Sequence, residues 1–240
     1  FWGDPPDDYG ISLQSPAGEK LYVSSSLGAG TQELSFIFVE TKVLVNYVKM
    51  ERLTGKQLIY FRFFHPAAGI WKINVSKKGK SGSRFHMWLP VQGLISPDTY
   101  FLESTPYITV TAPGDSTRSI TATAYQYLDN SLYFQAGRGF TPNSQVTPDL
   151  AAPGVDLLIP LPGGAFGKAS GSSLSSAVVA GAAALVQEWA IVRGNIPYAS
   201  GNTVKFYLQK GAVREEQMEY PNPGWGYGRL DLYRTFEIIN

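Results

Sequence analysis

A cluster of serines opens a helix of small apolar residues, and this feature restricts the fold of the chain more than any other. The segment reads Gly171-Ser172-Ser173-Leu174-Ser175-Ser176-Ala177 and continues without a break into apolar residues up to Val186. A helix start leaves N–H groups unpaired and carries the positive end of the helix dipole, so it stabilises an oxyanion that develops beside a serine. Serine is also among the commonest helix caps, which is the competing interpretation.

Three further segments accompany the serine cluster in a fixed order, two upstream and one downstream. They read Gly137-Arg138-Gly139-Phe140-Thr141, Thr147-Pro148-Asp149-Leu150-Ala151-Ala152-Pro153-Gly154-Val155 and Gly224-Trp225-Gly226-Tyr227-Gly228-Arg229-Leu230-Asp231. Together the four segments resemble the subtilase family of serine proteases over roughly residues 116–240. That family surrounds its nucleophile with Gly-Thr-Ser-x-Ala-Ala/Ser-Pro-x-Val-Ala-Gly, precedes it with Lys-Pro-Asp-x-x-Ala-Pro-Gly and closes with Tyr-Gly-x-Gly-x-x-Asp.

The resemblance assigns the catalytic nucleophile to Ser173 and the neighbouring threonine position to Ser172. Ala177 stands where the family usually has proline, and both departures keep small residues. The resemblance implies a serine endopeptidase that acts on a protein or peptide substrate. No residue is assigned to a cofactor or a metal, and the sequence does not determine the metal content.

A serine nucleophile needs a base within hydrogen-bond reach, and subtilisin-like enzymes place aspartate and histidine before the serine in the chain. The sequence has two histidines, His65 and His86, and neither has the family's Gly-Thr behind it, so we expect packing or surface roles for both. Asp4, Asp7 and Asp8 lie among prolines and predict a solvated turn.

The family's oxyanion-hole asparagine, normally in an Ala-Gly-Asn setting, is also missing from the sequence. We therefore expect that the chain is the C-terminal part of a longer protease. The catalytic aspartate and histidine and the oxyanion asparagine would then lie in the N-terminal part, which would be a partner of this chain, together with a prodomain. The chain alone is predicted to be inactive.

The first half of the sequence predicts a β domain over residues 1–115. Runs of β-branched and aromatic residues recur with turn signals between them, such as 27–30 and 77–82, and without a helical pattern. About eight such strands indicate a sandwich of the jelly-roll type. The runs are Ile11–Leu13, Leu21–Val23, Leu34–Val39, Val43–Val48, Leu58–Phe64, Ile70–Val75, Phe85–Val91 and Tyr107–Val110.

A jelly roll before the nucleophile segment narrows the resemblance to the clostridial germination subtilases, the Csp-type proteases. Segments that carry it include Gly69-Ile70-Trp71-Lys72-Ile73, Phe85-His86-Met87-Trp88-Leu89-Pro90 and Gln187-Glu188-Trp189. The group inserts a jelly roll between the histidine and serine regions, and its active member activates a spore-cortex lytic enzyme by cutting its propeptide. The resemblance thus implies a spore-associated or extracytoplasmic location. Some members have lost triad residues and are pseudoproteases, so that alternative stays open.

The second half, residues 116–240, predicts the tail of a doubly wound α/β sheet. We expect a buried strand over residues 119–125 and a short strand over 156–159. Helices are expected over residues 173–192, 201–210 and 232–238. The junction between the two domains is expected at residues 112–116.

Composition excludes several other classes of protein. The formal net charge is +1, which gives no broad basic face for nucleic acid, and the sequence contains no cysteine for a disulfide or thiolate metal site. The apolar run Ala177–Val186 is about half of a membrane span. A binding module remains the rival from another class, because jelly rolls often hold carbohydrate on an aromatic face and the chain offers Trp2, Trp71 and Trp88.

Overall fold

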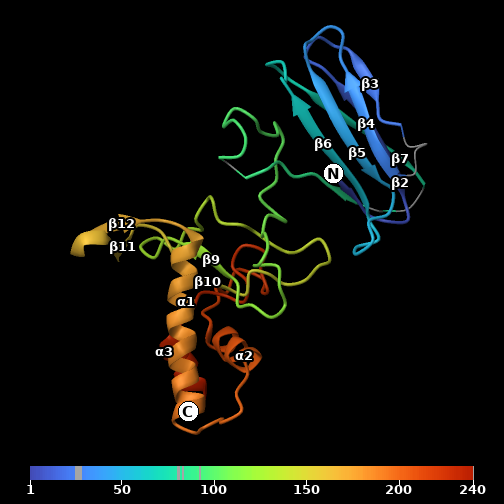
Figure 1. Ribbon diagram of the computed structural model, residues 1–240. Coiled ribbons are helices and arrows are strands. Elements are labelled where there is room, and N and C mark those ends of the chain that lie inside the picture. The colour runs from blue at the N-terminus through green and yellow to red at the C-terminus, as the bar shows by residue number, and fades with distance from the viewer. Residues whose placement is uncertain (25–28, 80–81, 83, 92, 240) are drawn as a thin grey trace. The chain divides into compact units, whose positions relative to one another are not determined.

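A computed structural model describes all residues except 25–28, 80–81, 83, 92 and 240. The chain forms two compact units, Phe1–Phe101 and Leu102–Asn240, which we call unit 1 and unit 2 (Figure 1). The sequence predicts a domain boundary between residues 115 and 116, which is further along the chain than the division into units after Phe101. That domain boundary stays a prediction. The predicted turns at 27–30 and 77–82 lie partly outside the described residues.

Unit 1 consists of two antiparallel sheets that share one apolar core. In the five-stranded sheet the order is β4 (Ala29–Ser35), β5 (Lys42–Val48), β6 (Gln57–Phe64), β1 (Trp2–Gly3) and β8 (Phe85–His86). In the three-stranded sheet the order is β3 (Lys20–Tyr22), β2 (Asp8–Gln14) and β7 (Lys72–Lys78). The core takes alternate residues from both sheets, among them Leu13, Val43, Val45 and Ile59.

Three predicted strands of the first half differ from the structure. The strand expected over Leu34–Val39 ends at Ser35, and beyond it the Ile37 and Phe38 N–H groups donate to the Glu19 carboxylate instead of to a neighbouring strand. Residues Tyr107–Val110 form no strand, because Ile108 has a φ of 59° and breaks the extended backbone; the segment keeps only a bridge from Tyr107 to Arg138. The strand expected over Phe85–Val91 ends at His86, ahead of Pro90, whose nitrogen has no hydrogen to donate.

Unit 2 is built on two parallel strands, β9 (Ala122–Tyr125) and β10 (Leu150–Pro153). A hairpin of β11 (Leu157–Pro160) and β12 (Phe166–Ala169), with a short 3-10 turn at Pro162–Gly164, follows β10. The helices are α1 (Ser172–Gln187), α2 (Gly201–Gly211) and α3 (Leu232–Ile239), and a π-helical turn at Glu188–Val192 extends α1. The three helices predicted from the sequence are confirmed with small shifts at their ends.

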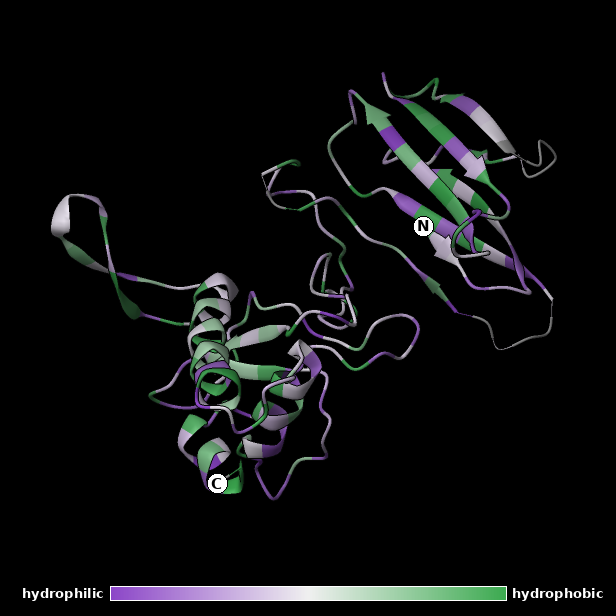
Figure 2. Cartoon of the chain, turned by 60° about the horizontal axis from the view of Figure 1, so that its bottom comes forward, coloured by the Kyte–Doolittle hydropathy of each residue, from purple (hydrophilic) through white to green (hydrophobic). Residues whose placement is uncertain are grey.

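The core of unit 2 forms where α1 and α2 cover β10. Leu150 and Ala152 of β10 are buried against Val179, Val186 and Leu208. Figure 2 shows apolar residues along α1 in green. Within the described part of the chain, one helix, Ser172–Val192, is long and apolar enough by length and composition to cross a membrane, and one face of it packs here against the core of unit 2.

Limited proteolysis tests the division of the chain. Residues 93–105 belong to no helix or strand and are mostly exposed, so we expect the first cut there. Gly114 and Ser116, in contrast, are held by backbone hydrogen bonds to Thr111 and Pro113. Mass spectrometry of the early fragments locates the cut. A first cut at residues 112–116 would support the boundary predicted from the sequence, and a first cut inside α1 would contradict the fold.

Candidate active site

The serine cluster occupies the first turn of α1 without capping it. The N-cap is Gly171, and no side chain makes a cap hydrogen bond at this end of the helix. Ser172 and Ser173 are the first two helical residues, and Ser173 is exposed. The capping interpretation therefore does not apply to Ser173, which belongs to the first helical turn, where N–H groups have no partner within the helix.

Ser175, in the same turn, points the other way and holds the helix in place. Its side chain is fully buried, and its hydroxyl lies 3.0 Å from the carbonyl oxygen of Ala152 and 3.1 Å from that of Pro153. Both carbonyls belong to the end of β10. One buried hydroxyl thus anchors the start of α1 to the carboxyl end of a parallel strand, where α/β folds place their sites.

Gly154 explains why a glycine follows Ala-Pro in the upstream motif. Its carbonyl accepts a 2.8 Å hydrogen bond from the Gly171 N–H. A Cβ at Gly154 would overlap the Ser175 hydroxyl and lie 2.8 Å from the Ala124 Cβ. Only a residue without a side chain allows the helix to approach the two strands this closely.

Ser173 lies in a cleft of about 730 Å³ that is formed entirely by unit 2. Ser172, Ser173 and Ser176 line it from the helix. The remaining walls come from residues 109–114, 119–122 and 134–137 and from Pro106 and Pro148. The cleft is lined by the hydroxyl groups of serines and threonines together with apolar side chains.

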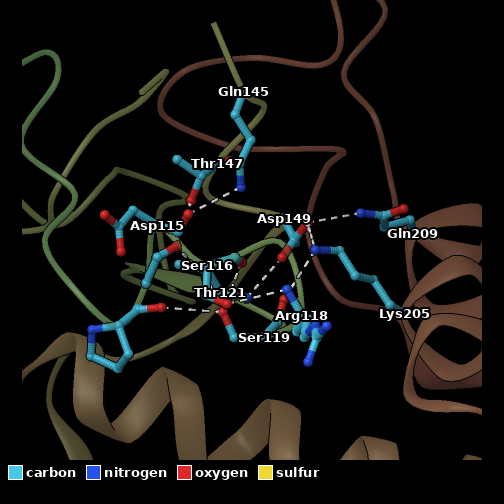
Figure 3. A network of polar contacts seen from close by, with 12 residues as sticks. Asp115, Ser116, Arg118, Ser119, Thr121, Gln145, Thr147, Asp149, Lys205 and Gln209 are labelled. Atoms are coloured by element: carbon cyan, nitrogen blue, oxygen red, sulfur yellow. Dashed lines mark hydrogen bonds and ion pairs between the residues drawn. The ribbon is translucent and has the colours of Figure 1, made fainter. Parts of the chain in front are cut away.

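Asp149, the acidic residue of the upstream motif, is the centre of a buried polar network (Figure 3). Its Oδ2 accepts a 2.8 Å hydrogen bond from the Thr121 N–H. Its Oδ1 lies 2.7 Å from the Lys205 Nζ and accepts a 3.0 Å hydrogen bond from the Gln209 side chain. The carboxylate thus ties the entry to β9 to helix α2, and every partner is a donor.

The closing motif near residue 227 pairs with β10 on its free edge. The Tyr227 N–H donates to the Asp149 carbonyl at 2.8 Å, and the Ala151 N–H donates to the Gly228 carbonyl at 2.9 Å. Gly226 has a φ of 59°, and a Cβ there would overlap the Asp149 carbonyl. The remaining motif joins them, because the Gly139 N–H donates to the Pro223 carbonyl at 2.8 Å. The four motifs separated in the sequence therefore meet in one unit.

Both histidines lie in unit 1, and unit 2 has none in its sequence. His65 is exposed with a φ of 48°, and its carbonyl accepts a hydrogen bond from Thr41. His86 is stacked on Trp88 with 5.4 Å between the ring centroids, and burial lowers the pKa of its imidazole. Both have packing or surface roles, as the sequence predicts.

The aspartates near the N-terminus are ion-paired. Asp4 lies 2.8 Å from Lys56, and Asp8 lies 3.8 Å from Lys49. Asp7 and Asp8 differ from the predicted solvated turn. Asp8 begins strand β2, and the Asp7 side chain is 2% exposed with its carboxylate 3.2 Å from the Lys77 ammonium. Alternating burial along the strands could not have shown this pairing, since the two residues are distant in the sequence.

The three tryptophans proposed for an aromatic face divide between core and surface. Trp88 is exposed and stacked on His86. Trp71 packs edge-on against Phe36 and Phe63 beside the core of unit 1. Trp2 pairs across strands with Leu58 and His86, on the sheet face opposite the buried Ile59. A carbohydrate-binding role for unit 1 stays a prediction.

Comparison with known proteins agrees with this arrangement. The chain matches the Subtilase family over residues 104–228. Among solved structures it is similar to the Clostridium perfringens CspB protease, at 30% identity and a TM-score of 0.87, over 99% of this chain and 51% of that one. The prenylagaramide maturation protease PagA is 21% identical, with a TM-score of 0.48, over 56% of this chain and 47% of that one. No match to a curated protein was found.

The fold of unit 2 and the serine at a helix start are those of the subtilisin-like class. The chain belongs to the subtilase family of proteases. It spans about half the length of the CspB protease that it matches.

Alanine substitutions of two serines in the first helical turn are expected to have unequal effects on stability. Ser173→Ala should change the free energy of unfolding by less than about 0.5 kcal/mol, because the side chain is exposed and caps nothing. Ser175→Ala should lower it by about 1–2 kcal/mol, because a buried hydrogen bond is lost. Urea denaturation followed by circular dichroism measures both. Equal losses would show that Ser173 is structural.

The pKa of His86 predicts that acid weakens unit 1. Its imidazole faces Asp4, Lys56 and Arg84, and burial holds its folded-state pKa below the unfolded value of about 6.5. The unfolded state therefore binds the proton more readily, so stability is complete above that pH and falls as the pH drops through the folded-state pKa. Urea midpoints between pH 7.5 and pH 5 should fall less in His86→Gln.

Proposed function

We propose that the chain is the C-terminal part of a subtilisin-like serine endopeptidase in which Ser173 is the nucleophile. The observation that carries this proposal is the position of Ser173, exposed at an uncapped helix start inside a cleft large enough for a peptide. The four family motifs meet around that cleft and around β10. Every one of these contacts lies within unit 2.

The rest of the catalytic machinery is proposed to come from an N-terminal part of the same protein. Among its described residues, unit 2 has only two parallel strands beneath its helices. Apolar side chains of the long helix are exposed, among them Val178, Leu185 and Val192. A subtilisin-like domain that extends the sheet and covers this helix would supply the aspartate, the histidine and the oxyanion asparagine. We further propose that unit 1 is the inserted jelly roll, which its two packed sheets support.

In the assembled protease the chemistry would follow from the position of Ser173. Its hydroxyl oxygen attacks the carbonyl carbon of the scissile peptide while the histidine accepts the hydroxyl proton. The N–H groups at the start of α1 stabilise the oxyanion of the tetrahedral intermediate, aided by the asparagine. The histidine then gives its proton to the leaving amine. Water next attacks the acyl-enzyme and releases the second product.

The proposed substrate is a protein precursor of the kind that the germination subtilases process, such as a spore-cortex lytic enzyme with its propeptide. The location proposed with it is spore-associated or extracytoplasmic. A prodomain is a further proposed partner. The alternative is a pseudoprotease scaffold, in which the surroundings of Ser173 are kept for packing while the protein binds and regulates a partner.

The test of catalysis uses both the chain and the full-length protease. The isolated chain should show no stoichiometric labelling by a fluorophosphonate probe, because the sequence of unit 2 contains no histidine to activate Ser173. In the full-length protein, Ser173→Ala should lower kcat by about 10⁴-fold or more, with the melting temperature unchanged. Ser176→Ala, in the same cleft, is the matched control and should keep most activity.

Two outcomes contradict the proposal. Labelling of the isolated chain that disappears in Ser173→Ala would show that a base exists within these residues. Full proteolytic activity of the full-length Ser173→Ala variant would remove Ser173 from catalysis. An inactive full-length wild type that still binds its partner would favour the pseudoprotease alternative.

A further inference from the structure

We propose that Lys205, on helix α2, is a positioning residue that fixes one wall of the cleft that holds Ser173. The inference rests on the proposed function, because it concerns how that cleft receives a peptide. Lys205 itself does not line the cleft. It would act through residues 119–121, which do.

The Lys205 ammonium joins three separate parts of unit 2. Its Nζ lies 2.7 Å from the Asp149 Oδ1 and donates a 3.0 Å hydrogen bond to the carbonyl oxygen of Ser119. The side chain of Lys205 is 18% exposed and that of Asp149 is 4% exposed. Figure 3 shows the lysine reaching from α2 to the carboxylate. An ion pair so well shielded from water is screened far less than a surface pair.

The wall segment, residues 113–121, is held together by its own polar contacts. The Thr121 hydroxyl donates to the Gly114 carbonyl at 2.7 Å, and the Thr147 hydroxyl donates to the same carbonyl at 3.1 Å. The Ser119 hydroxyl donates to the Ser116 carbonyl at 3.1 Å. Because these contacts hold the wall segment together, an attachment at one end of it fixes the position of the whole segment.

The Asp149–Lys205 ion pair is this attachment. Asp149 holds the Thr121 N–H with one carboxylate oxygen and Lys205 with the other, while Lys205 holds the Ser119 carbonyl. Pro113, Gly114 and residues 119–122 share the cleft with Ser172 and Ser173. Removing the ammonium would leave a buried carboxylate without a counter-charge, and the segment would have to open to let water reach it.

The first experiment measures the wall directly in the 240-residue chain. Hydrogen exchange followed by mass spectrometry should show exchange of residues 114–122 about tenfold faster in Lys205→Met. Lys210→Met is the matched control, because Lys210 is exposed on the same helix and lies over the Phe206 ring. It should exchange like the wild type. Lys205→Arg keeps the charge and should restore part of the protection.

The second experiment measures peptide binding in the full-length protease. Rates are expressed per active site titrated with a fluorophosphonate, so that loss of folded enzyme does not enter. Lys205→Met should raise KM for a peptide substrate about tenfold and leave kcat within about twofold. A purely structural role would lower the number of titrated sites and leave KM unchanged.

A milder variant covers the case in which Lys205→Met does not fold. Thr121→Val removes the hydroxyl that donates to Gly114 but keeps the ion pair, and it should raise exchange in the wall and KM in the same direction. Unchanged exchange in Lys205→Met, or an unchanged KM with an active full-length wild type, would overturn the inference. A wild type without turnover would instead count against the proposed function, while the exchange experiment still decides the role of Lys205.

Discussion

The close approach of helix α1 to the end of strand β10 is the contact on which unit 2 depends. It requires a residue without a side chain at Gly154, a buried hydroxyl at Ser175 and a main-chain hydrogen bond from Gly171. None of these groups takes part in the proposed chemistry. They determine that Ser173 faces the cleft while Ser175, half a turn away, faces the strand. In the first turn of α1, Ser175 therefore attaches the helix to the strand, while Ser173 is left for the proposed chemistry.

A second constraint acts from the opposite end of the same strand. Asp149 precedes β10, and its carboxylate and carbonyl groups receive donors from three directions: from the entry to β9, from helix α2 and from the closing segment at Tyr227. Burying a carboxylate that has a donor for each oxygen destabilises the fold little, whereas loss of one of those donors would lower the stability of the fold strongly. The motif therefore has an acidic residue at Asp149 because its carboxylate holds three segments of unit 2 together.

The sequence was most informative where the pattern was local. The three helices of unit 2 and the alternating strands of unit 1 follow from periodicity, and the register of the motifs singled out Ser173. It was uninformative where partners are distant in the chain. The burial of Asp7 beside Lys77 and the joining of Asp149 to Lys205 depend on tertiary contacts, and Ile108 left its expected strand through one unusual backbone angle.

The hairpin of β11 and β12 is closed at its base by hydrogen bonds between the residues that precede β11 and those that follow β12. Gly171 donates to Gly154 at 2.8 Å, and the Asp156 N–H donates to the Ser170 hydroxyl at 2.9 Å, so the two ends of the excursion are fastened to each other. Figures 1 and 2 both show the hairpin standing clear of the helices, and Leu158 and Phe166 are largely exposed on it. Because these hydrogen bonds hold the base of the hairpin, the length of the hairpin does not affect the position of Ser173. The tip at Gly163 and Gly164 is therefore a place where evolution or an engineer can graft an epitope or a fluorophore without displacing the helix behind it.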